Sequence, residues 1–214
     1  PDAPAASDAH AASAPKDAIA AIVAHAAGML WTKAVGGLAC EPGQSGSSTE
    51  TMAELAQIAR RHNATEVYVE DLFGLGMFAQ LLEPVLARHF LEPGQDPDYP
   101  NGWKATCENV HVTGQKEVRI IENLEPVLNQ HRLVIHQDAA ADPKLQHQLT
   151  RLTRQRDCLQ HDDRVEALAM AVWTWHDLLH QDPDVAAARD QQKLLDEQLE
   201  AHRNQLDAVR TLTD

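Results

Sequence analysis

Carboxylates stand at three separated places in this chain where a strand or helix is expected to begin or end. These acids are Asp8, with Asp2 as the alternative, then Glu70 followed by Asp71, and finally Asp162 and Asp163. Carboxylates that converge from different elements suit Mg²⁺ or Mn²⁺, because these hard cations prefer oxygen ligands. Two such ions about 4 Å apart can activate a water and stabilise the leaving oxygen in phosphodiester hydrolysis. The pattern is therefore compatible with a site for hydrolysis of a phosphodiester.

Each acid also has a simpler interpretation. Glu70 follows the apolar run 67–69, and an acid at the end of a strand can be a solvated loop residue. Asp162 and Asp163 open a helical pattern, where acids cap the helix and interact with its dipole. The residues alone leave both interpretations open, although two adjacent aspartates between His161 and Arg164 are more than capping needs.

The elements that must position these acids alternate between strands and helices. Apolar runs at 18–27 and 29–35, joined by a short Ala-Gly turn, predict a β-hairpin. The further expected strands are 65–70, 107–112 and 132–135, and the expected helices are 48–63, 76–89, 115–129, 143–153, 165–179 and 184–210. This order predicts an α/β fold with a mixed central sheet flanked by helices.

Two features of the expected helices carry predictions of their own. Pro126 lies near the end of helix 115–129, where it is expected to break or bend the last turn. Apolar residues recur in helix 184–210 in a near-heptad pattern. This C-terminal helix either packs back on the domain or serves as a docking helix, and the sequence favours neither.

Composition narrows the class of protein. The formal charge of −14 argues against a nucleic-acid coat protein, whose affinity comes from basic residues, but a carboxylate metal site adds negative charge by design. No apolar run is long enough for a membrane span and no leader is visible, so a soluble protein of the cytoplasm is expected. Three dispersed cysteines suit neither a disulfide framework nor a cysteine metal site.

Five blocks of sequence follow one known family in order. They are Met29-Leu30-Trp31 to Gly36-Gly37, Val69-Glu70 to Phe78, Gly114-Gln115-Lys116 to Val134, Gln148 to Arg154, and His161-Asp162-Asp163-Arg164 to Val172. With these blocks the chain resembles the nuclease domain of the tailed-phage terminase large subunit, of the DNA maturase B type found in short-tailed phages.

The resemblance implies an RNase H-like fold over 1–180, a C-terminal helical tail over 181–214, and a two-metal endonuclease using Mg²⁺ or Mn²⁺. Such an enzyme cuts concatemeric double-stranded phage DNA during genome packaging in the host cytoplasm. Glu70 resembles the acid on the family's second catalytic strand, and Asp162 and Asp163 match its His-Asp-Asp motif, with Asp163 favoured as the ligand. Asp8 fits the position of the first-strand acid best, whereas Leu75 stands where the family commonly carries Asp.

The resemblance also implies partners. The full-length family protein carries an ATPase domain and works with the portal and the small terminase subunit. Basic residues close in sequence to the predicted acids are assigned to DNA phosphate contacts; they are Lys116, Arg119, Arg151, Arg154 and Arg156. Two other functions compete: a non-catalytic docking domain that binds portal or capsid through helix 184–210, and a junction resolvase of the same fold.

Overall fold

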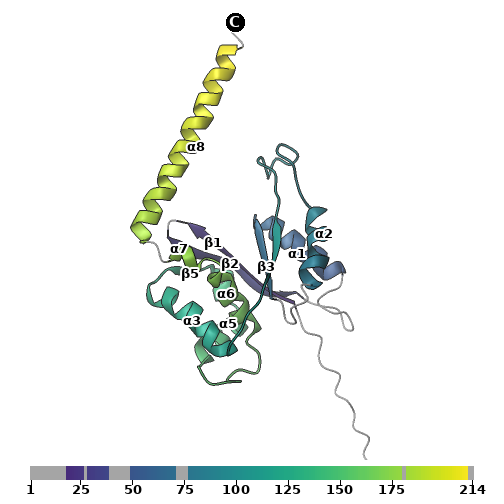
Figure 1. The fold of residues 1–214 in the computed structure, drawn as a ribbon, viewed down its shortest axis with the longest axis vertical. Helices are drawn as coiled ribbons and strands as arrows, with labels where there is room; N and C mark the ends of the chain where they lie inside the picture. The colour runs from purple at the N-terminus through teal and green to yellow at the C-terminus, as the bar shows by residue number, and fades with distance from the viewer. Residues whose placement is uncertain (1–17, 27, 39–48, 71–76, 180–181, 212–214) are drawn as a thin grey trace, which may run out of the picture.

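The strands and helices follow the predicted order along the chain (Figure 1). The computed structural model describes residues 18–26, 28–38, 49–70, 77–179 and 182–211. The strands are β1 (Ala18–Ala26), β2 (Met29–Leu38), β3 (Glu66–Glu70), β4 (Thr106–Val110) and β5 (Leu133–Ile135). The helices are α1 (Thr49–Arg61), α2 (Met77–Ala87), α3 (Lys116–Asn129), α4 (Gln137–Ala140), α5 (Pro143–Arg151), α6 (Asp163–Trp173), α7 (His176–Leu179) and α8 (Pro183–Thr211).

The strands form a mixed arrangement, as predicted, but their hydrogen-bonded ladders fall into two parts. β1 pairs antiparallel with β2 as the expected hairpin, and β2 pairs parallel with β5, which gives the order β1-β2-β5. β3 pairs parallel with β4 in a two-stranded sheet. Within the described ranges, β1 and β3 therefore each have one hydrogen-bonded neighbour.

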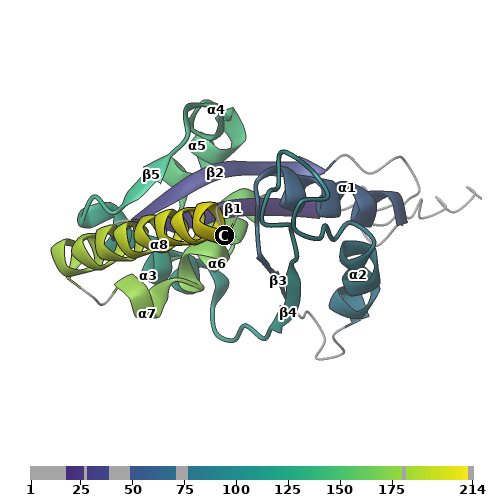
Figure 2. The same cartoon turned by 90° about the horizontal axis from the view of Figure 1, so that it is seen from above.

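Each part of the sheet has its own hydrophobic core. In the first region, made by β1, β2, β5, α3, α5 and α6, the helix α6 lies against the hairpin and α3 packs against α6 (Figure 2). Its fully buried side chains include Leu30, Ile120, Leu145, Val165 and Leu168. This core exists because α3, α5 and α6 each carry apolar residues at helical spacing on one face.

The second region contains α1, α2, β3 and β4. Met52, Ala56, Leu82 and Leu86 meet the inner face of the two-stranded sheet, and Trp103 closes the core from the loop between α2 and β4. The closest packing between elements lies inside one region or the other in the part of the chain that the structure describes. The two regions are therefore separate packing units, each with its own core, that meet along a boundary.

One local prediction was wrong. The helix expected over 165–179 ends at Trp173, and α7 begins at His176. The break follows from tertiary packing, because the Trp175 ring stacks on His25 of β1 with centroids 5.6 Å apart. Pro126 does not break α3, which continues to Asn129. The short helix α4 was not predicted.

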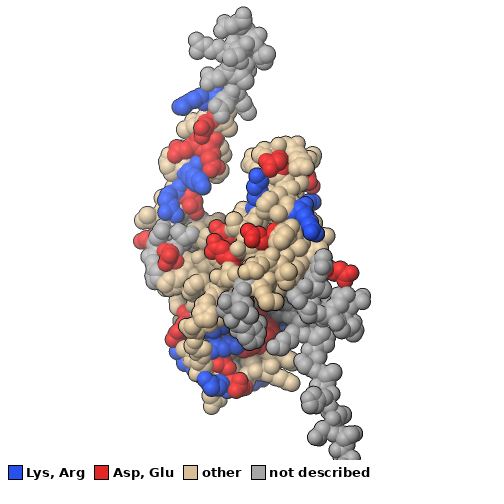
Figure 3. Space-filling view, turned by 45° about the vertical axis from the view of Figure 1, so that its right-hand side comes forward, with Lys and Arg blue, Asp and Glu red and all other residues tan. Residues whose placement is uncertain are grey.

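The C-terminal helix α8 projects from the rest of the molecule (Figure 1). Ala186 near its start is buried, whereas its neighbour Val185 is exposed, as are Leu195 and Leu199 further along. Side chains of both charges are interspersed along this helix (Figure 3). Among the helices that the structure describes, none has both the length and the apolar character needed to span a lipid bilayer.

Candidate active site

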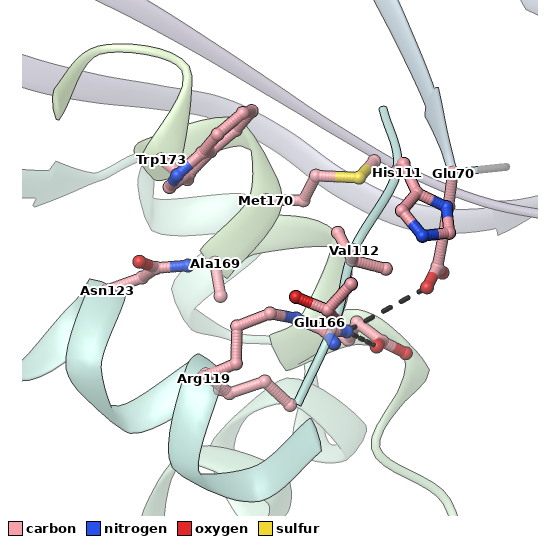
Figure 4. Close-up of a pocket in the computed structure, with 11 residues that line it drawn as sticks. Glu70, His111, Val112, Arg119, Asn123, Glu166, Ala169, Met170 and Trp173 are labelled. Carbon is pink, nitrogen blue, oxygen red and sulfur yellow. Dashed lines mark hydrogen bonds and ion pairs between the residues drawn. The ribbon is translucent and has the colours of Figure 1, made fainter. Parts of the chain in front are cut away.

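A pocket of about 230 Å³ lies where the two regions meet. The second region contributes Glu70 at the end of β3 and His111 just after β4, and the first region contributes the facing sides of α3 and α6. Figure 4 shows Glu70, Arg119 and Glu166 pointing toward one another in this pocket. The pocket therefore gathers charged side chains from three elements that are far apart in sequence.

Glu70 is delivered to the pocket by a parallel strand pair. Val67 and Val69 of β3 pack on the second core, and Glu70 pairs in register with buried Val110 of β4. The carboxyl ends of β3 and β4 therefore lie at the same edge, where polar groups of α/β proteins commonly form ligand sites. This placement agrees with the expected position of Glu70 at the end of a strand.

The start of α6 is fixed by groups outside the helix. The buried Gln148 side chain accepts a hydrogen bond from the Val165 N–H at 3.0 Å, which satisfies a donor that the helix itself leaves free. Arg164 forms an ion pair with Asp142 at 2.9 Å. These contacts set the direction of the first turn of α6 and hence of its acids.

Asp162 occupies the N-cap position of α6, yet its side chain makes no capping hydrogen bond. It pairs instead with Lys116 of α3, with 2.6 Å between Lys116 Nζ and Asp162 Oδ1. A side-chain capping hydrogen bond therefore does not account for Asp162. Asp163, the first residue of α6, is exposed.

Glu166 is the centre of the charged network. Lys116 Nζ lies 2.6 Å from Glu166 Oε2, and Arg119 Nη2 lies 2.6 Å from Glu166 Oε1. The same Arg119 nitrogen is 3.8 Å from Glu70 Oε1, so one guanidinium bridges a helix of the first region and a strand of the second (Figure 4). Two cations thus face three carboxylates across the boundary.

Burial shapes the electrostatics of this network. Burial raises the pKa of Glu166 above its usual value and the nearby Glu70 charge adds to this, although hydrogen bonding to Lys116 and the charge of Arg119 oppose the shift. Burial would lower the pKa of Lys116, but its hydrogen bonds to Asp162 and Glu166 prevail and raise it. The lysine therefore stays charged at neutral pH and holds the two acids together.

The segment that leads into α6 is also held by α3. A hydrogen bond from its own backbone lowers the pKa of the buried Glu117, and the Asp157 N–H, which donates to Glu117 Oε1 at 2.7 Å, lowers it further. Arg151 at the end of α5 is exposed, as are Arg154 and Arg156 in this segment. Arg154 forms a surface ion pair with Glu125, and its carbonyl accepts a hydrogen bond from Gln115.

The structure brings together some of the predicted site residues and says nothing of others. Glu70 and Asp162 join the same network, through Arg119 and Lys116. Asp8, its alternative Asp2, Asp71 and Leu75 lie outside the described residues. Lys116 and Arg119, expected to contact DNA phosphates, pair with acids instead in this structure. Their role toward DNA stays a prediction, as does that of the three exposed arginines.

Sequence reasoning missed Glu166. It follows Asp162 by four residues, and residues at this spacing lie on one face of a helix. That spacing was visible in the sequence and could have identified Glu166 as a member of the site. Asn123 and Trp173, which also line the pocket, carried no comparable signal.

The donor chemistry of the pocket suits a hard cation, since its acids offer carboxylate oxygens. The carboxylates of Glu70 and Glu166 both face the guanidinium of Arg119. Within the described ranges, however, no three His, Cys, Asp or Glu side chains are placed to hold a metal ion. In the described residues, the arrangement is three carboxylates partly neutralised by a lysine and an arginine.

Strands in two ladders with flanking helices, and acids at a strand end and a helix start, define an α/β protein with a charged site. The family profile described as "Terminase Bacteriophage T7, Ribonuclease H-like domain" matches residues 10–133. The large terminase subunit of Enterobacteria phage T3 is 32% identical over 172 residues, an alignment that covers 73% of this chain and 26% of the phage protein. The chain thus spans about a quarter of that relative's length.

The chain belongs to this terminase family, and its fold is RNase H-like. The resemblance drawn from the five sequence blocks is therefore confirmed. The family match begins after Asp8, so the comparison does not identify the first-strand acid.

Proposed function

We propose that this chain is the nuclease domain of a phage DNA-packaging terminase and that it cuts concatemeric double-stranded DNA with the help of Mg²⁺ or Mn²⁺. The observation that carries the proposal is the meeting of Glu70 and α6 in one pocket. The end of β3 and the start of α6 are more than ninety residues apart in the sequence, yet the fold brings Glu70 and Glu166 to one pocket. Family membership supports the same conclusion.

The residues that would hold the metal ions are Glu70, Asp162 and Asp163, with Asp8 as the acid of the first strand. When bound, two ions would supply an activated water and stabilise the departing oxygen. Asp163 suits such a role because it is exposed and directly follows Asp162. The chain itself would orient the acids through the fixed start of α6 and the strand pair β3–β4.

DNA would approach over the exposed arginines of the segment before α6. Arg151, Arg154 and Arg156 lie close in sequence to the acids, and phosphate contacts from arginine position a duplex without reading its sequence. We therefore expect cleavage with little sequence preference that weakens as salt rises. The ATPase domain of the full-length protein, the portal and the small terminase subunit would be its partners in the host cytoplasm.

Domain boundaries follow from the same proposal. Residues 1–180 would form the nuclease domain and 181–214 a helical tail. The exposed Val185, Leu195 and Leu199 of α8 favour a second function, docking of the chain on another packaging component. That function requires no cutting, and the experiment below separates the two.

The test is cleavage of supercoiled plasmid by the purified chain in Mn²⁺, in Mg²⁺ and in EDTA. We expect nicked and linear products with either ion and none in EDTA. Glu70→Ala should abolish them, because it removes the only acid that β3 brings to the pocket in the described residues. Glu66→Ala is the matched control, since Glu66 is an exposed acid at the other end of the same strand.

A folded chain that never cuts would contradict the nuclease proposal and favour docking through α8. Cleavage by Glu70→Ala at the wild-type rate would remove Glu70 from the site. Cleavage in EDTA would remove the metal ions from the proposal. Circular dichroism of each variant would show whether it is folded.

A further inference from the structure

We propose that Arg119 holds the position of a divalent cation between Glu70 and Glu166 while the metal is absent, and that metal binding displaces it. This inference rests on the proposed function, because it concerns the same pocket. It adds Glu166 to the acids that face the ion and gives Arg119 a regulatory role there.

The first support is the place of the guanidinium. Arg119 Nη2 is 2.6 Å from Glu166 Oε1 and 3.8 Å from Glu70 Oε1, so one nitrogen faces carboxylates from two elements. No other ion pair is formed by Glu70 among the described residues. Two carboxylates that face a common point need a positive charge between them, and either a guanidinium or a metal ion can supply it.

The second support is the difference between the two cations. Lys116 contacts Asp162 and Glu166 at 2.6 Å each and ties the start of α6 to α3. Arg119 has one short contact, to Glu166, and one long contact, to Glu70. The interaction across the boundary is therefore the weaker one, and Arg119 is the cation that can leave without releasing α6.

The third support is space beside the guanidinium. Arg119 lines the pocket of about 230 Å³ together with Asn123 and Trp173, which lie on the side away from Glu70 (Figure 4). Its side chain is partly exposed, at 23%. The long arginine side chain can therefore swing away from Glu70 while α3 stays in place.

The balance of charges around Arg119 also supports its displacement by a metal ion. Glu70, Asp162 and Glu166 carry three negative charges against the two positive charges of Lys116 and Arg119. A divalent cation added to this set would meet strong repulsion from Arg119 at close range. If Arg119 leaves, the ion faces the carboxylates of Glu70 and Glu166 without a guanidinium between them, which is a favourable balance. The displaced Arg119 would then be free to contact a DNA phosphate, its predicted role.

The experiment is Mn²⁺ binding to the full chain without DNA, measured by isothermal titration calorimetry. Competition between Arg119 and the ion is a coupling between two ligands of one site, and such couplings typically change affinity about 5- to 150-fold. We expect Arg119→Gln to lower the Kd for Mn²⁺ at least about fivefold. Glu166→Gln should raise it by a similar factor because one ligand is lost.

Two further variants keep the test specific. Arg119→Lys retains the charge and should bind Mn²⁺ with nearly wild-type affinity. Lys104→Gln removes a positive charge from an exposed ion pair with Glu92, neither of which lines the pocket, and should also leave the affinity unchanged. An equal gain in Lys104→Gln would show a general effect of net charge and overturn the inference.

Unchanged or weaker Mn²⁺ binding by Arg119→Gln would also overturn it, because Arg119 would then support the carboxylates rather than compete with the ion. If the wild-type chain still cuts DNA with metal in that case, the proposed nuclease function stands and only the role of Arg119 fails. A wild-type chain that neither binds Mn²⁺ nor cuts DNA contradicts both.

Discussion

The two regions of this molecule bury their polar groups differently. In the first region, the buried polar side chains Glu117, Arg132 and Gln148 bind the backbone of loops and helix ends. In the second region, apolar packing dominates, and Trp103 and Tyr99 each donate one hydrogen bond to a carbonyl at the end of α1 or just after it.

The difference reflects what each region contributes to the pocket. The second region delivers one described acid, Glu70, and a strand end held by its partner strand needs little further support. The first region delivers the acids of α6, and the start of a helix has free N–H groups that must be satisfied and oriented. Polar contacts are directional, so they fix the start of α6 more closely than apolar packing can.

The comparison predicts unequal consequences for two similar substitutions. Gln148→Leu leaves the buried Val165 N–H unpaired, and Trp103→Phe leaves the Ala64 carbonyl without its indole donor. Each should lower the free energy of unfolding by about 1–3 kcal/mol, measured by urea denaturation. Only Gln148→Leu should also weaken Mn²⁺ binding and DNA cleavage, because only it disturbs α6.

If Trp103→Phe impaired Mn²⁺ binding as much as Gln148→Leu, the polar contacts of the first region would not be the specific support of the site. The pocket would then depend on the stability of the whole molecule.

A change of pH should have a smaller effect on stability, because each region contains one histidine whose pKa is lowered. Burial lowers the pKa of His25 below 6.5, Arg132 and Arg189 add to this, and Asp190 opposes it. Burial also lowers the pKa of His62, together with Lys33 and Arg61. Below pH 6.5 the unfolded chain takes up a proton that the folded chain binds less readily, so stability should fall as the pH drops.

Thermal unfolding between about pH 7.5 and 5.5 measures this effect. His25→Gln and His62→Gln should each flatten the loss of stability toward acid pH, since each removes one proton-linked group. The larger change is expected for His25→Gln, because the Nε2 atom of His25 is buried and has no hydrogen-bond partner among the described residues. An unaltered pH dependence in both variants would contradict this account.

Much of the fold was predictable because its signals are local. The apolar runs beside Gly28 predicted the hairpin, and the run Val67–Val69 predicted the strand that ends at Glu70. The division of the strands into two ladders was not predictable, since it depends on pairing between segments far apart in sequence. The end of α6 at Trp173 was missed for the same reason, because the contact of Trp175 with His25 is tertiary.

The candidate site was predictable in part. Glu70 and Asp162 were identified by their positions at element ends, and both join the network. Lys116 and Arg119 were interpreted as a basic surface because sequence shows the charge of a side chain but not its partner. Their pairing with Glu166 and Asp162 depends on how α3 packs against α6.

The most direct test of this account is the anomalous difference density of crystals of the chain soaked in MnCl₂ and measured near the manganese absorption edge. We predict a peak between the carboxylates of Glu70 and Glu166, with the Arg119 guanidinium moved away from Glu70. A peak elsewhere, or Arg119 still bridging the two acids beside a bound ion, would contradict the claim that the two regions form one metal site at their boundary.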